Sequence, residues 1–182
     1  MSDEQVIRHC APTLASIKTA NLFSSFFVSR QEMLNHVRNL NFRLRGKGLR
    51  VLALLYKDHR GLIYVYRPDK LSKDLQNELA KSLLYECGYT CTDENKCIQK
   101  LIERLAHESD FPHEIGLFLG YPPEDVDGFI NRRNECKFCG FWKVYGDVEA
   151  AQKLFSRYRK CTNIYCRLCQ EGESIEKLTV AA

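Results

Sequence analysis

The sequence predicts an α+β fold in which a small mixed or antiparallel sheet of about four strands is flanked by helices. Two runs rich in β-forming residues, RVLALLY and LIYVY, are joined by the polar stretch KDHRG, which is typical of a β-hairpin. On both sides of this hairpin, apolar residues recur at helical spacing. The chain has 182 residues, of which 45% are hydrophobic and 27% charged. We therefore expect a single folded domain over residues 1–182.

The N-terminal segment is predicted to form two short helices. A capping box at residues 2–5 opens the first helix. It is expected to end near Cys10, because Pro12 removes a backbone donor and clashes with the preceding turn. Thr13 would cap a second helix that reaches Leu22.

A longer helix is predicted before the hairpin. Ser29 and Glu32 form a second capping box, and Gly46 ends the helix. One face of this helix carries Met33, Val37, Leu40 and Leu44.

Two further helices are predicted after the hairpin. The first ends at Gly88 and places on one face Leu71, Leu75, Leu79 and Leu83. Thr92 opens the second, whose apolar residues are Ile98, Leu101, Ile102 and Leu105.

The pattern changes after Pro112. The run EIGLFLGYP indicates a buried strand, EDVDGFI a short helix, and KFCGFWKVY another strand. Asp147 can cap a long final helix, with one face formed by Val148, Ala151, Phe155, Tyr158 and Cys161.

Charge and composition predict where the protein is located and which partners it has. The first residues are charged and lack the apolar core of a signal peptide, and no apolar run is long enough to span a membrane. A cytoplasmic, reducing location is therefore expected, where nine cysteines indicate buried, reactive or metal-binding thiols rather than a disulfide framework. The net charge of +4 is modest, so a nucleic-acid partner is not expected, although residues 41–50 form a basic turn.

The first candidate site is a thiol site. Cys10, at the start of the predicted second helix, would face unpaired N–H groups that favour the thiolate. His113 is the candidate base, and Asp147 or Glu114 would orient it. The alternative is that Cys10 packs as a small apolar side chain and His113 lies at a strand end.

The second candidate site binds metal. Two C-x2-C pairs, Cys136 with Cys139 and Cys166 with Cys169, offer the four thiolates of a tetrahedral zinc site. The 26 residues between the pairs exceed the usual interval. The second pair also falls within a predicted helix, and a strand would send the first pair to opposite faces.

The third candidate is a binding pocket without covalent chemistry. The aromatic runs FWKVY and GLFLGYP contribute Trp142, Tyr145 and Phe118, and aromatic pockets with a few polar groups are common ligand sites. Trp142 and Tyr145 are the candidate cofactor contacts. Aromatic residues at this spacing are nevertheless more often core residues than cofactor contacts.

Several strings together resemble one known family. CAPTLASIKTANLF, PHEIGLFLGYPPEDVDGFI, CGFWKVYGD and the closing LTVAA resemble domain-of-unknown-function family 3793, found in anaerobic bacteria, over nearly the whole chain. The family pattern leads us to expect glycine where this chain has Ser16. The resemblance implies no activity, and it hints at genes for iron transport and flavodoxins as neighbours.

Two hypotheses follow. The first is a cytoplasmic protein with a thiol-dependent site, built from Cys10, His113 and the segment CGFWKVYGD, that acts on a small molecule, a metal or a cofactor. The second is a non-enzymatic binding or adaptor protein in metal or redox homeostasis, whose fold a structural zinc ion at the two cysteine pairs would stabilise.

Overall fold

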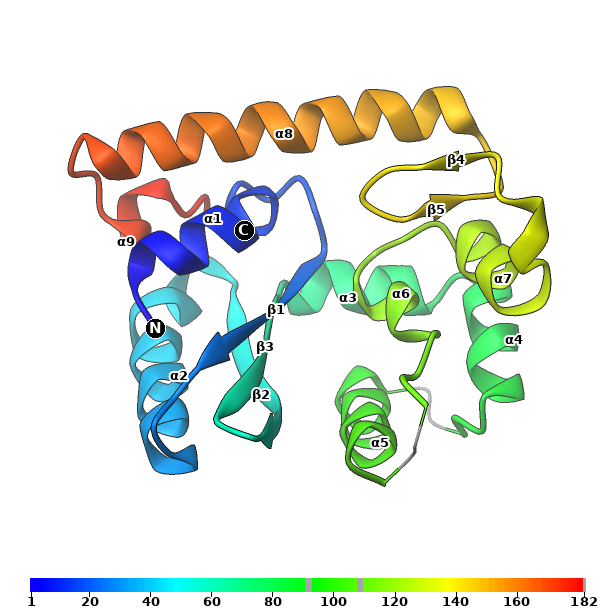
Figure 1. The fold of residues 1–182 in the computed structure, drawn as a ribbon, viewed down its shortest axis with the longest axis horizontal. Helices are drawn as coiled ribbons and strands as arrows, with labels where there is room; N and C mark the ends of the chain where they lie inside the picture. The colour runs from blue at the N-terminus through cyan, green and yellow to red at the C-terminus, as the bar shows by residue number, and fades with distance from the viewer. Residues whose placement is uncertain (91–92, 108–109, 182) are drawn as a thin grey trace. The chain divides into compact units, whose positions relative to one another are not determined.

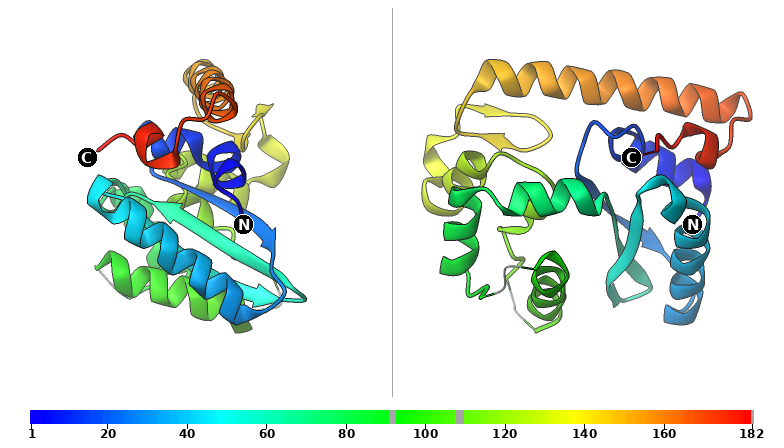
Figure 2. Two further views of the ribbon diagram at one scale, coloured as in Figure 1. Left: turned by 90° about the vertical axis from the view of Figure 1, so that its left-hand side faces the viewer. Right: turned by 180° about the vertical axis from the view of Figure 1, so that it is seen from behind.

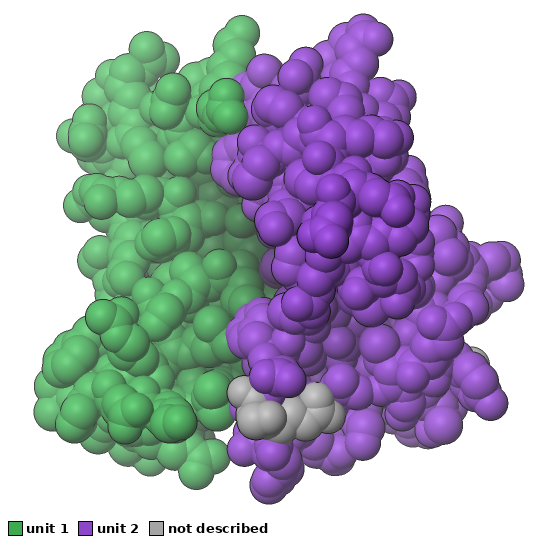
Figure 3. Space-filling view, turned by 45° about the vertical axis from the view of Figure 1, so that its right-hand side comes forward, with its two compact units in different colours: residues 1–69, 158–182 green, residues 70–157 purple. Residues whose placement is uncertain are grey.

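The computed structural model describes residues 1–90, 93–107 and 110–181, and Figure 1 shows its ribbon. The chain divides into two compact units, which are coloured separately in Figure 3. Unit 1 comprises Met1–Asp69 and Tyr158–Ala182, and unit 2 comprises Lys70–Arg157. Each unit combines helices with antiparallel strands, which confirms the α+β class. That the chain is a single domain stays a prediction.

A three-stranded antiparallel sheet forms the centre of unit 1. Its strands are β1 (Ala20–Phe26), β2 (Arg50–Lys57) and β3 (Arg60–Tyr66), in the order β1-β3-β2. β2 and β3 are the predicted hairpin. Asp58 and His59 at its turn both have positive φ, 49° and 59°, which matches the right-handed twist of the two strands.

Helices cover one face of this sheet. α1 (Asp3–Leu14) packs near β1, and α2 (Arg30–Leu44) packs on β2 and continues into a 3-10 turn, η1 (Arg45–Lys47). The short α9 (Ile175–Leu178) lies against α1 (Figure 2). The predicted face of α2 is confirmed, since all four of its apolar residues join the core with Phe23, Val51, Ile63 and Val65.

The predicted break before Pro12 is wrong. α1 continues through Pro12 to Leu14, because the burial of Cys10 and Leu14 and the hydrogen bonds from Arg67 to the Thr13 and Leu14 carbonyls outweigh the one backbone donor that proline removes. The Pro12 carbonyl accepts hydrogen bonds from the backbone N–H groups of Ile17 at 2.9 Å and Lys18 at 3.1 Å. The chain then turns at Ser16, whose φ of 57° lies in the region that favours glycine. β1 therefore replaces the expected second helix.

Unit 2 is mostly helical. Its helices are α3 (Pro68–Leu75, which begins in unit 1), α4 (Glu78–Glu86), α5 (Glu94–His107), α6 (Ile115–Phe118) and α7 (Pro123–Asn131). A 3-10 turn, η2 (Arg133–Glu135), leads to the hairpin of β4 (Phe138–Cys139) and β5 (Lys143–Val144). α8 (Val148–Gln170) starts in unit 2 and ends in unit 1.

Three predictions for unit 2 need correction. The leucine-rich helix is two helices, because the side chain of Asn77 accepts from the N–H groups of Leu79 and Ala80 and so starts α4. The run EIGLFLGYP forms α6 and a turn instead of a strand, and KFCGFWKVY forms two strands instead of one. The predicted start at Thr92 lies outside the described residues. Within the described ranges, no helix is long and apolar enough to cross a membrane.

Candidate ligand-binding pocket

A pocket of about 400 Å³ lies within unit 2, among α6, α7 and the β4–β5 hairpin. Five aromatic side chains line it, namely Phe111, Tyr121, Phe129, Phe141 and Trp142. The size is within the range of small-molecule sites, which are mostly apolar with a few placed polar groups.

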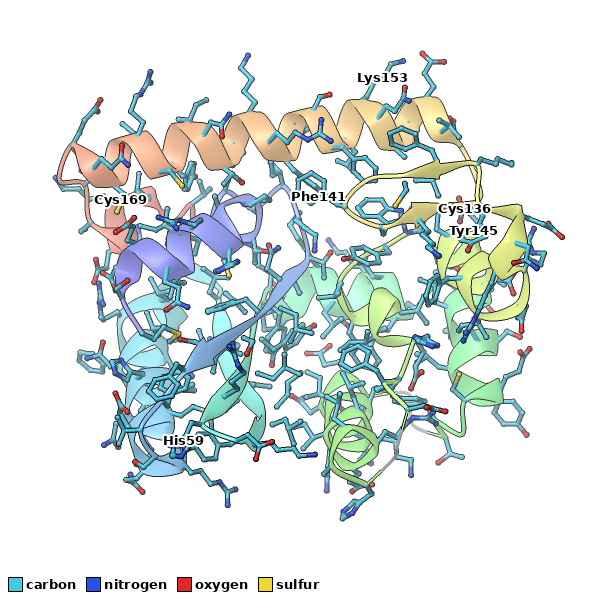
Figure 4. All side chains as sticks on the ribbon, in the orientation of Figure 1. His59, Cys136, Phe141, Tyr145, Lys153 and Cys169 are labelled. Carbon is cyan, nitrogen blue, oxygen red and sulfur yellow. The ribbon has the colours of Figure 1, made fainter. Side chains whose placement is uncertain are left out.

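Trp142 lines the pocket with an aromatic ring that other aromatic side chains hold in place. Its ring stacks on Tyr121 with centroids 4.5 Å apart, and it meets Phe155 of α8 edge-on, also at 4.5 Å. Phe141, which is labelled in Figure 4, lies in the loop between β4 and β5. Its ring packs on Phe155 with centroids 5.4 Å apart. Because its ring is held on two sides and is 8% exposed, Trp142 presents a fixed aromatic surface to the pocket.

Asp125 of α7 holds the hairpin in place. One carboxylate oxygen, Oδ2, accepts from Trp142 Nε1 at 2.7 Å. The other, Oδ1, accepts from the backbone N–H groups of Tyr145 at 2.7 Å and Gly146 at 2.8 Å. Gly128 on the same helix allows this close approach, since a Cβ there would lie 2.2 Å from Tyr145 Cγ.

Three polar side chains reach the pocket near Phe129. The His113 ring meets Phe129 edge-on at 4.9 Å, and Lys143 Nζ lies 5.4 Å from the centre of the Phe129 ring. Cys139 is exposed and stands opposite Lys143 in the hairpin register. Within the described part of the chain, neither the His113 imidazole nor the Lys143 ammonium has a hydrogen-bond or ion-pair partner.

The pocket gathers part of the predicted sites. His113, Trp142 and Cys139 line it together. Tyr145 lies behind it instead, where its hydroxyl donates to the Arg133 carbonyl at 3.3 Å. The role of Asp125 was missed, and the sequence offers no signal for it beyond its place in the first turn of a short helix.

The residues expected to orient His113 have other partners. Asp147 Oδ1 accepts from the Ala150 N–H at 3.0 Å, which confirms Asp147 as the cap of α8. Glu114 is buried and accepts from the Tyr89 hydroxyl at 2.9 Å, while Arg104 lies at 2.8 Å. Burial, together with the neighbouring Glu114 charge, raises the pKa of Tyr89, so this group stays neutral beside the carboxylate.

Cys10 is a core residue of unit 1. It lies in the second half of α1, not at a helix N-terminus, and is 0% exposed within the core cluster. Burial raises the pKa of its thiol, which opposes the thiolate that a nucleophile requires. Its partner in the thiol hypothesis, His113, belongs to unit 2.

The cysteine pairs are divided between the units. Cys136 and Cys139 belong to unit 2, whereas Cys166 and Cys169 lie near the end of α8 in unit 1. Figure 4 labels one cysteine of each pair, Cys136 and Cys169. In residues 1–90, 93–107 and 110–181, no group of three or more His, Cys, Asp or Glu side chains is arranged to hold a metal ion. The zinc site therefore stays a prediction without structural support.

The cysteines should differ sharply in reactivity. Iodoacetamide applied to the native, reduced protein is expected to modify exposed Cys139 at least about 100-fold faster than Cys10, which reacts only when the core opens. Peptide mass spectrometry over a time course gives both rates in one sample. Fast modification of Cys10 in the folded protein would contradict its core role and restore the thiol hypothesis.

Comparison with known proteins gives one match. A family model described as "Protein of unknown function (DUF3793)" matches residues 6–179. No curated protein and no solved structure matches the chain.

Proposed function

The chain belongs to this family of proteins of unknown function, and from that starting point we propose that it is a small-molecule binding protein whose site is the aromatic pocket of unit 2. The observation that carries the proposal is the combination of a pocket of about 400 Å³, a fixed aromatic surface at Trp142, and polar side chains beside Phe129 that have no hydrogen-bond or ion-pair partner within the described residues. A partly open pocket of this size, lined mostly by aromatic side chains, is typical of a small-molecule site.

The polar groups support binding more strongly than catalysis. Asp125 already accepts three hydrogen bonds, so it is committed to holding the hairpin. His113 has no orienting carboxylate within the described residues, since Glu114 and Asp147 contact other groups. We propose no thiol chemistry at Cys10, because that residue is in the core of unit 1.

Trp142 provides a direct test because it is the single tryptophan of the chain and lines the pocket. Titration with N-phenyl-1-naphthylamine, a neutral aromatic fluorophore, should give energy transfer from Trp142 with a dissociation constant of about 1–100 µM, as expected for a ligand of this size. Phe129→Ala removes part of the wall and should raise this constant about 10-fold.

Two controls localise the binding. Phe42→Ala, at a side chain of unit 1 that is 76% exposed, should leave the constant within about 2-fold. The bound fluorophore should also slow alkylation of Cys139 but not of Cys136, which does not line the pocket. The absence of energy transfer, or equal alkylation of Cys139 with and without the fluorophore, would overturn the proposal.

A further inference from the structure

We propose that the pocket prefers a planar aromatic acid, with the rings against Trp142 and the carboxylate at Lys143 and His113; this rests on the proposed binding function. The shape of the pocket alone does not specify the charge of the ligand. The charged groups around Phe129 do, through the way in which they are paired.

Two cations lie against the ring of Phe129. Lys143 Nζ is 5.4 Å from the ring centre, and the guanidinium carbon of Arg133 is 5.6 Å from it. Neither cation forms an ion pair within the described part of the chain, whereas the His113 ring approaches the same phenyl edge-on. A ring is a weaker partner for a cation than a carboxylate is, so Lys143 keeps most of its capacity to bind an anion.

The acidic residues near these cations have other partners. Asp127 and Glu135 both pair with Arg132, at 2.9 Å and 3.7 Å, and neither forms an ion pair with Lys143 or Arg133 within the described residues. Asp125 directs both oxygens to N–H donors of Trp142, Tyr145 and Gly146. Lys143 is therefore a cation that lines the pocket and has no ion-pair partner within the described residues.

The geometry also places the charge at one side of an aromatic surface. Lys143 and Cys139 face each other across the β4–β5 hairpin, and Phe141 and Trp142 lie in the loop that joins these strands. An aromatic ring that packs on Trp142 thus has the Lys143 ammonium within the same short hairpin. Binding of a rigid acid would order mainly the exposed Lys143 side chain, because the Trp142 ring is already held by Tyr121 and Phe155.

The test compares two ligands of nearly the same shape, 2-naphthoate and the neutral 2-naphthamide, by competition with N-phenyl-1-naphthylamine on the full chain. We expect 2-naphthoate to bind about 5–10-fold more tightly, the effect of one charge-assisted hydrogen bond. Lys143→Met should abolish this difference and leave 2-naphthamide unchanged. Lys153→Met makes the same charge change at a side chain of α8 that is 73% exposed and paired with Glu149, and it should preserve the difference (Figure 4).

The outcomes separate the two proposals. Equal affinities for the acid and the amide, with the fluorophore still bound, overturn the preference for an acid and leave the binding function intact. A difference in affinity that persists in Lys143→Met also overturns the preference proposed for this site, because a group other than Lys143 would then distinguish the acid from the amide. Failure of the fluorophore and both naphthalene ligands to bind overturns the binding function together with the inference.

Discussion

Asp125→Ala should lower the free energy of unfolding by about 3–5 kcal/mol, because it leaves three buried donors without an acceptor. These donors are Trp142 Nε1 and the backbone N–H groups of Tyr145 and Gly146, all within 2.8 Å of the carboxylate. The side chain is 3% exposed, so water replaces the lost bonds poorly. Urea unfolding followed by Trp142 emission measures the change directly at the site.

Two variants make this result specific. Asp125→Asn keeps one oxygen for the backbone donors but turns an amide N–H₂ group toward Trp142 Nε1, so its cost should lie between those of the wild type and Asp125→Ala. Glu124→Gln alters an exposed carboxylate on the preceding residue and should change stability by less than about 0.5 kcal/mol. If Asp125→Ala costs no more than Glu124→Gln, then Asp125 does not hold the hairpin in place.

Arg67→Met should lower the free energy of unfolding by about 3–4 kcal/mol through the loss of buried, charge-assisted hydrogen bonds. Arg67 is 2% exposed, and its guanidinium donates to the carbonyls of Thr13 and Leu14 at 2.8 Å and of Val180 at 2.7 Å. Burial lowers the pKa of this arginine, but the charge also faces the negative end of the α1 dipole. The same contacts fix the C-terminal segment, since the Val180 N–H donates to the Leu14 carbonyl.

Circular dichroism during urea unfolding gives the size of the effect, and hydrogen exchange at residues 178–181 reports the release of the C-terminal segment. Arg38→Met is the matched control, because Arg38 is exposed on α2, and it should change stability by less than about 0.5 kcal/mol. Unchanged protection of residues 178–181 in Arg67→Met would show that the arginine does not fix the segment.

The sequence predicted the pocket only in part. The aromatic runs FWKVY and GLFLGYP were expected to line a site through Trp142, Tyr145 and Phe118. Trp142 lines the pocket, whereas Phe118 is fully buried and the Tyr145 hydroxyl contacts the Arg133 carbonyl, and ligand binding at the pocket stays a prediction. The role of Asp125 could not be predicted, since its partners follow it by 17 to 21 residues and meet it only after α7 and the hairpin pack. His113 was selected as a base, yet the carboxylates expected to orient it contact Tyr89 and the backbone of α8 instead.

Local signals alone determined the α2 helix, the β2–β3 hairpin and the cap of α8 at Asp147. Each of these elements depends on residues that are close together in the sequence. At the start of α2, for example, the Ser29 side chain accepts a hydrogen bond from the Glu32 N–H. Tertiary structure decided the passage of α1 through Pro12 and the strand that follows it. There the burial of Cys10 and Leu14, and the capture of the Thr13 and Leu14 carbonyls by Arg67, outweigh the single bond that a proline removes. These contacts involve residues more than 50 positions away, such as Arg67 with Thr13, so local sequence patterns could not predict them.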